Sequence, residues 1–161
     1  MGAEAERSRG APRIAIADDL ETVRALFREY ADSLEEHKPY LVGFDDEVDA
    51  LPADYDFILL SENGGCVAVR QLDERACEMK RLYVRPAARG TGIGRALVAA
   101  AVEHARDRGY DVMRLDTLPM MAEAATLYRS LGFVEVERYN DNPAPGVRFM
   151  ELDLRPPRVG T

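Results

Sequence analysis

The stretch RPAARGTGIGRALVAAAVEHARDRG, residues 85–109, constrains the fold more strongly than any other part of the sequence. Gly90, Gly92 and Gly94 stand at alternate positions, directly before an amphipathic helix predicted over 92–108. Glycine lets the backbone approach a ligand closely, and the first turn of a helix presents unpaired amides that favour a phosphate group. The stretch therefore predicts a turn that binds a phosphate-bearing ligand.

Two other common phosphate-binding patterns do not fit this turn. The pattern GxxxxGK[ST] of nucleotide-binding loops occurs nowhere in the chain. The dinucleotide pattern GxGxxG, counted from Gly90, would need its last glycine where Arg95 stands. NAD is therefore the weaker alternative, while Arg85, Arg89 and Arg95 supply positive charge around the turn.

The periodicity of apolar residues predicts a chain of mixed strands and helices. Strands are predicted over 13–17, 57–60, 66–72, 76–84, 112–116, 133–138 and 147–154. Helices are predicted over 92–108 and 119–131, and after a capping box at Asp18 and Glu21. The segment 37–56 is loop-like, with a short helical turn at 46–51. Three strands follow one another between the first two helices, so the pattern predicts an α/β layer with a partly antiparallel sheet.

Two segments resemble the sequence motifs of the GNAT superfamily of N-acetyltransferases. Val84-x-Pro86 followed by Arg89-Gly90-x-Gly92-x-Gly94 is similar to the coenzyme A pyrophosphate loop of that family. Downstream, Ala124-x-x-Leu127-Tyr128-x-x-x-Gly132-Phe133 resembles its second motif, in the same order and at the same separation. The resemblance covers residues 13–154. It implies an α/β (α+β) fold in which about four helices flank a mixed, mostly antiparallel sheet of about six to seven strands.

The resemblance also implies that acetyl-CoA binds as the acyl donor. Amides of 90–94 would hold the pyrophosphate, and backbone groups of Leu82 and Val84 would pair with the pantetheine arm. A splay between that strand and the strand at 112–116 would open the slot. The implied cofactor-binding residues are Leu82, Tyr83, Val84, Arg89, Gly90, Thr91, Gly92, Ile93, Gly94 and Arg95.

Two catalytic residues are implied by the same resemblance. Tyr128 would protonate the departing thiolate, since an unperturbed tyrosine keeps its proton at neutral pH. The alternative role for Tyr128 is a core aromatic on the apolar side of its helix. Glu78 would take a proton from the attacking amine, with Asp116 as the next candidate. The alternative role for Glu78 is a solvated strand residue that pairs with Lys80 or Arg70.

One position departs from the family pattern. Many relatives carry an asparagine seven residues before the tyrosine, where this chain has Met121. This removes one polar contact to the cofactor, and Thr117 is a candidate to replace it.

The amine acceptor is expected between residues 30–55 and 139–147, because relatives bind it there. Residues 18–62 hold 14 acidic residues against 3 Lys or Arg, whereas residues 63–115 hold 10 Lys or Arg against 6 acidic ones. A cationic small-molecule amine would be drawn to the acidic part. The carboxylates behind this expectation are Glu35, Glu36, Asp45, Asp46, Glu47 and Asp49. Acetylation of a protein or peptide amine, and acyl-CoA sensing without turnover, remain open.

Length, net charge and composition limit the possible number of domains, the partners and the location of the protein. The length of 161 residues predicts one domain, 13–155, between a disordered leader at 1–12 and a disordered tail at 156–161. A net charge of −8 argues against nucleic acid as a partner. No apolar run approaches the ~20 residues of a membrane helix, and no signal-like segment is seen. We therefore expect a cytoplasmic protein without a membrane partner, which could pair as a homodimer through exposed C-terminal strands.

Few soft ligands are available for a metal. The two cysteines, Cys66 and Cys77, lack CxxC spacing, and only His37 and His104 could join them. The sequence therefore predicts no metal site and two buried free thiols, although neighbouring strands would make a disulfide conceivable.

Overall fold

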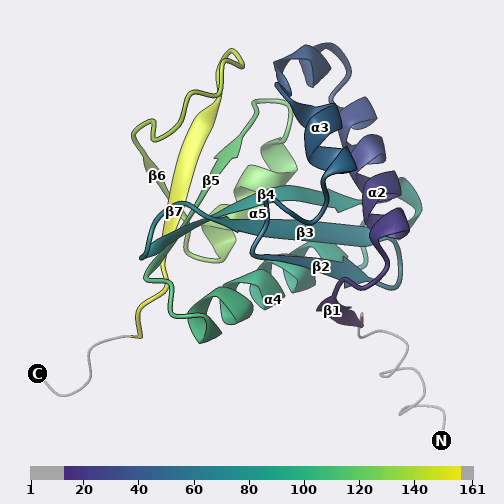
Figure 1. Cartoon of the computed structure of the whole chain (residues 1–161). Helices are drawn as coiled ribbons and strands as arrows, with labels where there is room; N and C mark the ends of the chain where they lie inside the picture. Colours follow the sequence, from purple (N-terminus) through teal and green to yellow (C-terminus); the bar gives the residue numbers. More distant parts are fainter. Residues whose placement is uncertain (1–12, 157–161) are drawn as a thin grey trace, which may run out of the picture.

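A single sheet of seven strands, in the order β1-β2-β3-β4-β5-β7-β6, runs through the computed structural model (Figure 1). The structure describes residues 13–156, so the predicted leader and residues 157–161 of the predicted tail lie outside it. Only β4 and β5 pair in parallel, and every other neighbouring pair is antiparallel. The predicted mixed, mostly antiparallel sheet is thereby confirmed. The strands are β1 (Ile14–Ile16), β2 (Phe57–Ser61), β3 (Gly65–Gln71), β4 (Ala76–Val84), β5 (Val112–Thr117), β6 (Val134–Val136) and β7 (Arg148–Asp153).

Helices cover both faces of the sheet. Those described are α2 (Leu20–Ser33), α3 (Phe44–Asp49), α4 (Ile93–Asp107), α5 (Ala122–Ser130) and the short 3₁₀ helices η1 (Glu35–Tyr40) and η2 (Pro86–Ala88). Helices α4 and α5 pack on one face, and α2 and α3 on the other (Figure 1). The four α-helices of residues 13–156 agree with the expected number.

Three local predictions need correction. The N-cap of α2 is Asp19, whose carboxylate accepts from the amide of Thr22 at 3.1 Å, so the capping box expected at Asp18 lies one residue early. Helix α5 begins at Ala122, not at Pro119, because the amide of Met121 first closes a turn on the carbonyl of Leu118. The loop-like segment after α2 contains two short helices, η1 and α3, where only one helical turn was expected.

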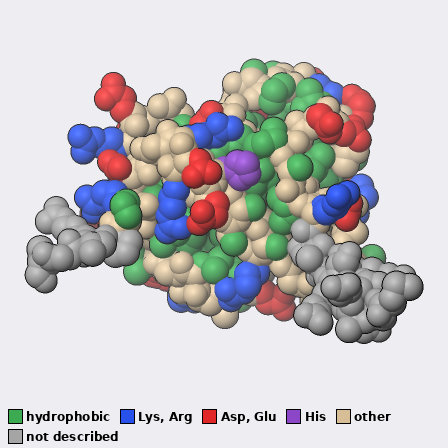
Figure 2. All heavy atoms as spheres, turned by 90° about the horizontal axis from the view of Figure 1, so that it is seen from below, with side chains coloured by type: hydrophobic (Ala, Val, Ile, Leu, Met, Phe, Trp, Pro, Cys, Tyr) green, Lys and Arg blue, Asp and Glu red, His purple; other side chains and the backbone are tan. Residues whose placement is uncertain are grey.

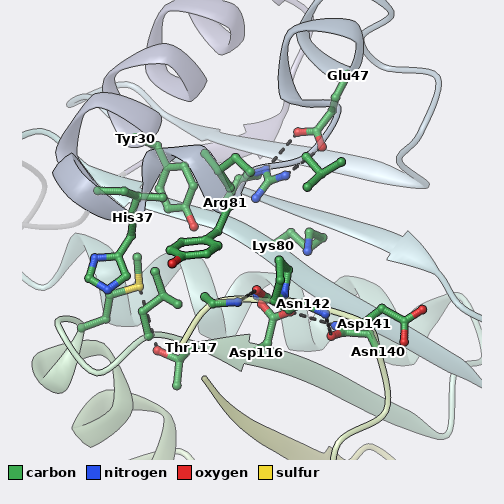
Figure 3. Close-up of a pocket in the computed structure, with 18 of the residues that line it drawn as sticks. Tyr30, His37, Glu47, Lys80, Arg81, Asp116, Thr117, Asn140, Asp141 and Asn142 are labelled. Atoms are coloured by element: carbon green, nitrogen blue, oxygen red, sulfur yellow. Dashed lines mark hydrogen bonds and ion pairs between the residues drawn. The ribbon is translucent and has the colours of Figure 1, made fainter. Parts of the chain in front are cut away.

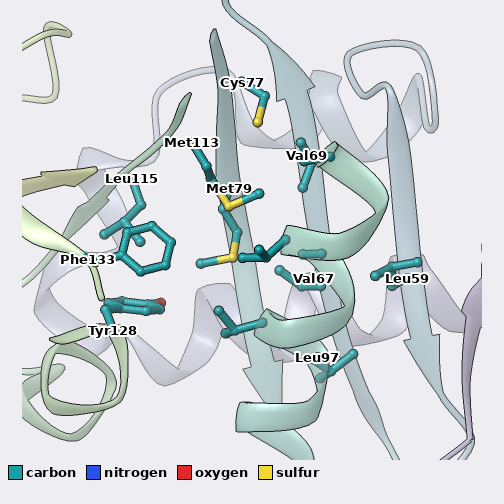
Figure 4. Close-up of a cluster of buried hydrophobic side chains, with 14 of the residues drawn as sticks. Leu59, Val67, Val69, Cys77, Met79, Leu97, Met113, Leu115, Tyr128 and Phe133 are labelled. Carbon is teal, nitrogen blue, oxygen red and sulfur yellow. The ribbon is translucent and has the colours of Figure 1, made fainter. Parts of the chain in front are cut away.

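The larger apolar cluster lies between the sheet and helices α4 and α5. Met79, Met113, Leu115 and Leu97 of this cluster are at most 3% exposed, and Tyr128 lies beside Phe133 at its edge (Figure 4). Each fully buried side chain of this size stabilises the fold by roughly 1.5–3 kcal/mol relative to an exposed one. The core therefore holds the strand ends and α5 in fixed positions.

Both cysteines are buried and free, as predicted. Cys77 belongs to the cluster under α4, whereas Cys66 belongs to the cluster under α2, so the two thiols face opposite sides of the sheet. A disulfide between them is therefore excluded. Burial raises the pKa of each thiol to about 12, which makes both poor nucleophiles.

Strands β4 and β5 diverge after a short paired segment. They pair only where residues 76–78 meet residues 112–114, and the rest of each strand has no partner in the other. On its other side β4 pairs with β3, and the register of this pairing shifts between Cys66 and Ala68. Arg81 lies on β4 at this shift and has a positive φ of 62°. A bulge of this kind bends the strand and increases its twist. The two strands therefore splay apart, as the family resemblance implies.

The outer features of the fold leave some predictions open. β6 is an edge strand and Val134 on it is 59% exposed, but the homodimer stays a prediction.

Seen from the side on which α4 lies, Lys and Arg side chains are interspersed with Asp and Glu (Figure 2). Among the described residues, no helix is long and apolar enough to cross a membrane. In the same residues, no group of three or more His, Cys, Asp or Glu side chains could hold a metal ion.

Candidate functional site

The glycine turn leads directly into helix α4. Gly90 and Gly92 have φ values of +79° and +84°, a region that other residues rarely adopt, and a Cβ at either position would meet no atom within 4 Å. The first bond within the helix runs from the amide of Ala96 to the carbonyl of Gly92, at 3.0 Å. No side chain caps the helix, so its first three amides remain available to an anion.

The three arginines around the glycine turn differ in whether an acidic side chain already balances their charge. Arg85 forms an ion pair with Glu29 at 3.0 Å, so it supplies less free charge to the turn than the sequence suggests. Arg89 donates to the carbonyl of Val84 at 3.0 Å, and Arg95 donates to the hydroxyl of Ser130 at 2.6 Å. Neither Arg89 nor Arg95 has an acidic partner within 4 Å among the described residues, and both are exposed. These two arginines are therefore the charged groups that can meet a phosphate.

The remaining predicted cofactor residues have distinct positions. Leu82 lines the space between β4 and β5, whereas the ring of Tyr83 packs on the opposite face, 6.5 Å from that of Tyr30. Ile93 is buried and anchors the start of α4, and the hydroxyl of Thr91 donates to the carbonyl of Ala88. Tyr83 and Ile93 could therefore contact a ligand through their backbone only.

Tyr128 closes the space between the diverging strands. This slot has a volume of about 30 Å³, and its lining residues are Tyr30, Met79, Lys80, Arg81, Leu82, Asp116, Met121 and Tyr128. Burial raises the pKa of Tyr128 above its ordinary value, and the Tyr30 and Asp116 side chains add to the effect. Its hydroxyl therefore keeps its proton at neutral pH and can act as a proton donor.

A larger cavity of about 440 Å³ adjoins the slot (Figure 3). Both spaces are lined by Tyr30, Lys80, Arg81, Asp116 and Met121, so one opens beside the other. The cavity is also lined on one side by Leu34, His37, Tyr40, Leu41 and Val42 and on the other by residues 140–144, within the two segments expected to hold the acceptor. Val42 at its rim is 84% exposed, which shows that the cavity opens to solvent.

One ion pair fixes a wall of this cavity. The guanidinium of Arg81 donates to both carboxylate oxygens of Glu47, at 2.9 and 2.8 Å (Figure 3). Burial alone would raise the pKa of Glu47, but the Arg81 guanidinium outweighs it and holds the pKa below its ordinary value. Arg81 also lies over the rings of Tyr30 and Phe44, at 5.6 and 5.4 Å. The bulge of β4 is thereby tied to α2 and α3.

Glu78 lies beneath the cavity and does not line it. Its side chain is 0% exposed and accepts from Arg70 at 2.6 Å, from the Tyr139 hydroxyl and from Asn140 at 3.1 Å. The ammonium of Lys80 is 3.7 Å from the same carboxylate. Glu78 is thus a buried, fully bonded carboxylate, and no direct contact with an amine in the cavity is open to it.

Asp116, the second candidate for proton acceptance, lines both the cavity and the slot. Its carboxylate accepts from Asn140 at 2.8 Å and from Asn142 at 3.2 Å. Burial alone would raise the pKa of Asp116, but Lys80, the two amides and Arg81 outweigh it and hold the pKa below its ordinary value. Asp116 is therefore ionised at neutral pH beside Tyr128.

The structure adds cavity residues that sequence reasoning did not name as functional. Lys80 was weighed only as a partner for Glu78, and Arg81, Asn140 and Asn142 were not singled out. Of the six carboxylates that suggested a cationic acceptor, only Glu47 lines the cavity, and Arg81 neutralises it. Thr117 contacts Met121 at 4.0 Å through its hydroxyl, close to the slot. The number of acidic residues in this part of the sequence therefore does not indicate the charge of the cavity.

Comparison with known proteins agrees with this arrangement. Residues 53–135 match the family of acetyltransferase (GNAT) domains. An uncharacterized N-acetyltransferase from Schizosaccharomyces pombe is 45% identical over 91 residues, which cover 56% of this chain and 56% of that protein. The aligned stretches span 38–56% of the length of three such relatives, so the chain spans about half the length of the relatives it matches.

Solved structures extend the similarity to the whole described fold. A Klebsiella pneumoniae protein described as an acyl-CoA N-acyltransferase is 27% identical with a TM-score of 0.71, covering 91% of this chain and 99% of that one. A Salmonella typhimurium protein described as an acetyltransferase, solved with its cofactor acetyl-CoA, is 25% identical with a TM-score of 0.69, covering 90% of this chain and 95% of that one. This chain belongs to the GNAT acetyltransferase family.

Proposed function

We propose that the protein transfers the acetyl group of acetyl-CoA to a primary amine of a small molecule. One observation supports the proposal: helix α5 carries Leu127, which lies against Gly94 of the glycine turn, and Tyr128, which lines the slot that adjoins the open cavity. A phosphate-binding turn, a proton donor and room for a second substrate are the parts that acyl transfer needs.

The residues present fit acetyl-CoA. The uncapped amides of α4 and the exposed Arg89 and Arg95 would hold the pyrophosphate, in the open space left by Gly90 and Gly92. At Leu82 and Val84 the edge of β4 that faces β5 has no partner in that strand, so it would pair with the pantetheine arm as a strand does. The Arg89 side chain donates a hydrogen bond to the carbonyl of Val84, and this bond would break when the pantetheine arm binds.

Acetyl-CoA supplies an activated thioester carbonyl. The amine nitrogen attacks that carbon as the free base, a C–N bond forms, and the C–S bond breaks. Tyr128 donates its proton to the departing sulfur, which leaves as the thiol of CoA, and Tyr128 then regains a proton from water. The extra proton of the amine is lost to water through the open mouth of the cavity, and Asp116 orients the amine at the slot. Glu78 positions Asp116 through the shared amide of Asn140.

The shape of the cavity favours a small acceptor over a protein surface. Walls from residues 34–42 and 140–144 enclose it on two sides, and its volume is about 440 Å³. This is within the usual range for a small-molecule site. An extended peptide would need a groove that continues beyond both walls.

Thermal unfolding in the presence of acetyl-CoA, CoA, NAD and NADP tests the cofactor. A ligand at one hundred times its Kd stabilises by about 2.7 kcal/mol, which raises Tm by roughly 5–10 °C in a chain of this size. We expect that shift with both CoA forms and none with NAD or NADP. Mass spectrometry of an amine panel then detects the acetylated product. Stabilisation by the dinucleotides alone, or tight binding of acetyl-CoA without any product, would contradict the proposal.

A further inference from the structure

Two cationic side chains on the floor of the cavity share one buried carboxylate. Arg70 and Lys80 both face the single carboxylate of Glu78, which is bonded to Arg70 at 2.6 Å. The nearest carboxylate oxygen to the Lys80 ammonium in residues 13–156 is that of Glu78, at 3.7 Å, beyond hydrogen-bonding distance. The Lys80 side chain is only 16% exposed. A partly buried ammonium without a close partner is costly, so an anion in the cavity would be stabilised there.

A negative charge lies beside this ammonium, at the slot. Asp116 accepts hydrogen bonds only from the neutral amides of Asn140 and Asn142, and none of the ion pairs within 4 Å among residues 13–156 includes it. Asp116 lines the slot that Tyr128 closes, whereas Arg70 lines the larger cavity alone. Lys80 lines both spaces, so the floor presents a carboxylate and an ammonium side by side at the slot and a further cation, Arg70, away from it.

The opposite wall of the cavity is mostly apolar, with His37 as a polar side chain in it. Its lining includes Leu34, Tyr40, Leu41, Val42, Leu118 and Met121. An acceptor therefore meets charged groups of both signs on the strands and apolar side chains on the other side (Figure 3). On the floor a second ammonium, as in a polyamine, would be repelled by Lys80 and Arg70, and the exposed Asp141 at the cavity is the remaining lining carboxylate that could attract it.

We propose that the acceptor is a zwitterionic amine: a small molecule with a carboxylate next to the reacting amine and an apolar substituent, as in an apolar α-amino acid. This inference rests on the proposed acetyl transfer. The amine lies at Asp116, the carboxylate lies at Lys80 and Arg70, and the apolar substituent lies against residues 34–42.

Matched acceptors test the inference on the full chain. L-leucine, L-methionine and L-phenylalanine are each compared with the corresponding amide and decarboxylated amine, with spermidine as a polyamine. CoA release is followed with a thiol reagent, and kcat/KM is corrected for the fraction of unprotonated amine. We expect at least one amino acid to exceed its amide and its decarboxylated amine by tenfold or more, which corresponds to about 1.4 kcal/mol.

Variants connect that preference to the cavity floor. Lys80→Met should bring the ratio of amino acid to decarboxylated amine close to one, and Lys80→Arg should restore most of it. Lys38→Met removes an exposed lysine outside the cavity and should leave the ratio as it is. The decrease should be in the ratio and not in the affinity for acetyl-CoA, which calorimetry measures separately.

The outcomes separate this inference from the proposed function. CoA release that is equal or faster with the amides, the decarboxylated amines or spermidine would overturn the zwitterionic acceptor and leave acetyl transfer intact. A preference that survives in Lys80→Met would also overturn it. Absence of CoA release with every amine would overturn both.

Discussion

Arg81 and Glu47 form a two-point ion pair across 34 residues of sequence, with N–O distances of 2.9 and 2.8 Å. Arg81 lies in the bulge of β4, and Glu47 lies on the short helix α3. Their side chains are 9% and 14% exposed, so neither charge is well solvated. The pair holds a six-residue helix, which has little stability of its own, over the cavity.

Glu47→Gln should therefore be strongly destabilising. It leaves the buried guanidinium of Arg81 without a counter-charge, and the free energy of unfolding should decrease by about 3 kcal/mol. Glu21→Gln is the control, because Glu21 pairs with Arg24 on the surface and contributes less than about 0.5 kcal/mol. Urea unfolding at pH 7 measures both. Equal small losses would show that the pair does not support the wall.

The same pair makes a prediction about pH. The pKa of Glu47 is lowered in the folded state, so the ionised pair stabilises the fold above the unfolded pKa of about 4.5, and this contribution is lost as pH falls through the lower folded pKa. The stability difference between the wild type and Glu47→Gln should be constant near neutral pH and decrease below about pH 5. A difference that grows on acidification would contradict the assigned direction.

Tyr128→Phe should separate binding from chemistry. Loss of the proton donor should lower kcat about 100-fold, because general acid catalysis contributes on the order of 10²–10⁴. The Kd for acetyl-CoA should hardly change. Tyr110→Phe is a matched control, since Tyr110 is also buried but donates to Asp56 away from the slot. A kcat for Tyr128→Phe within threefold of the wild type would remove Tyr128 from the mechanism.

The pH profile of the wild type gives a second test of Tyr128. Burial raises its pKa above the ordinary value of 10, so the hydroxyl stays protonated throughout the range in which amines titrate. Activity should rise with pH as the acceptor loses its proton, and should not fall before about pH 10. A decrease in kcat between pH 7 and 9, absent in Tyr128→Phe, would show that Tyr128 titrates much lower.

Glu78→Gln and Asp116→Asn should differ in their effects. Glu78 is buried beneath the cavity, so Glu78→Gln should lower the free energy of unfolding by roughly 1–3 kcal/mol and change kcat/KM of the folded protein only modestly. Asp116 faces the acceptor, so Asp116→Asn should chiefly raise the KM of the amine. Steady-state kinetics on samples of checked foldedness measure both. A 100-fold loss of kcat in Glu78→Gln with normal stability would restore Glu78 as the proton acceptor.

Local sequence was enough to predict the glycine turn and the helix that follows it. The glycines at 90–94 and the apolar face of residues 93–107 are patterns within one short segment, so no distant contact is needed to recognise them. The structure has a turn and a helix there. The divergence of β4 from β5 followed from the family resemblance of the same segment. The predicted N-cap of α2, Asp18, lies one residue before the observed N-cap, Asp19, because both residues are aspartates and cap a helix equally well.

The cavity and its lining could not be predicted in the same way. Asn140 reaches the carboxylates of Glu78 and Asp116 from 62 and 24 residues away, a contact that exists only once the strands are paired. Arg81 adopts a positive φ that its residue type does not indicate. Counting carboxylates in residues 30–55 also misled, since most of them do not line the cavity.

The most direct test is a calorimetric titration of acetyl-CoA into two variants, Gly92→Ala and Gly109→Ala. The two glycines have φ values of +84° and +88°, lie at opposite ends of α4, and have open space around an added Cβ. Each substitution should cost roughly 1–2 kcal/mol of stability through the same backbone strain. We predict that only Gly92→Ala weakens acetyl-CoA, by at least tenfold, with Gly109→Ala binding as the wild type does. Equal affinity in both variants would mean that the glycine turn does not hold the cofactor.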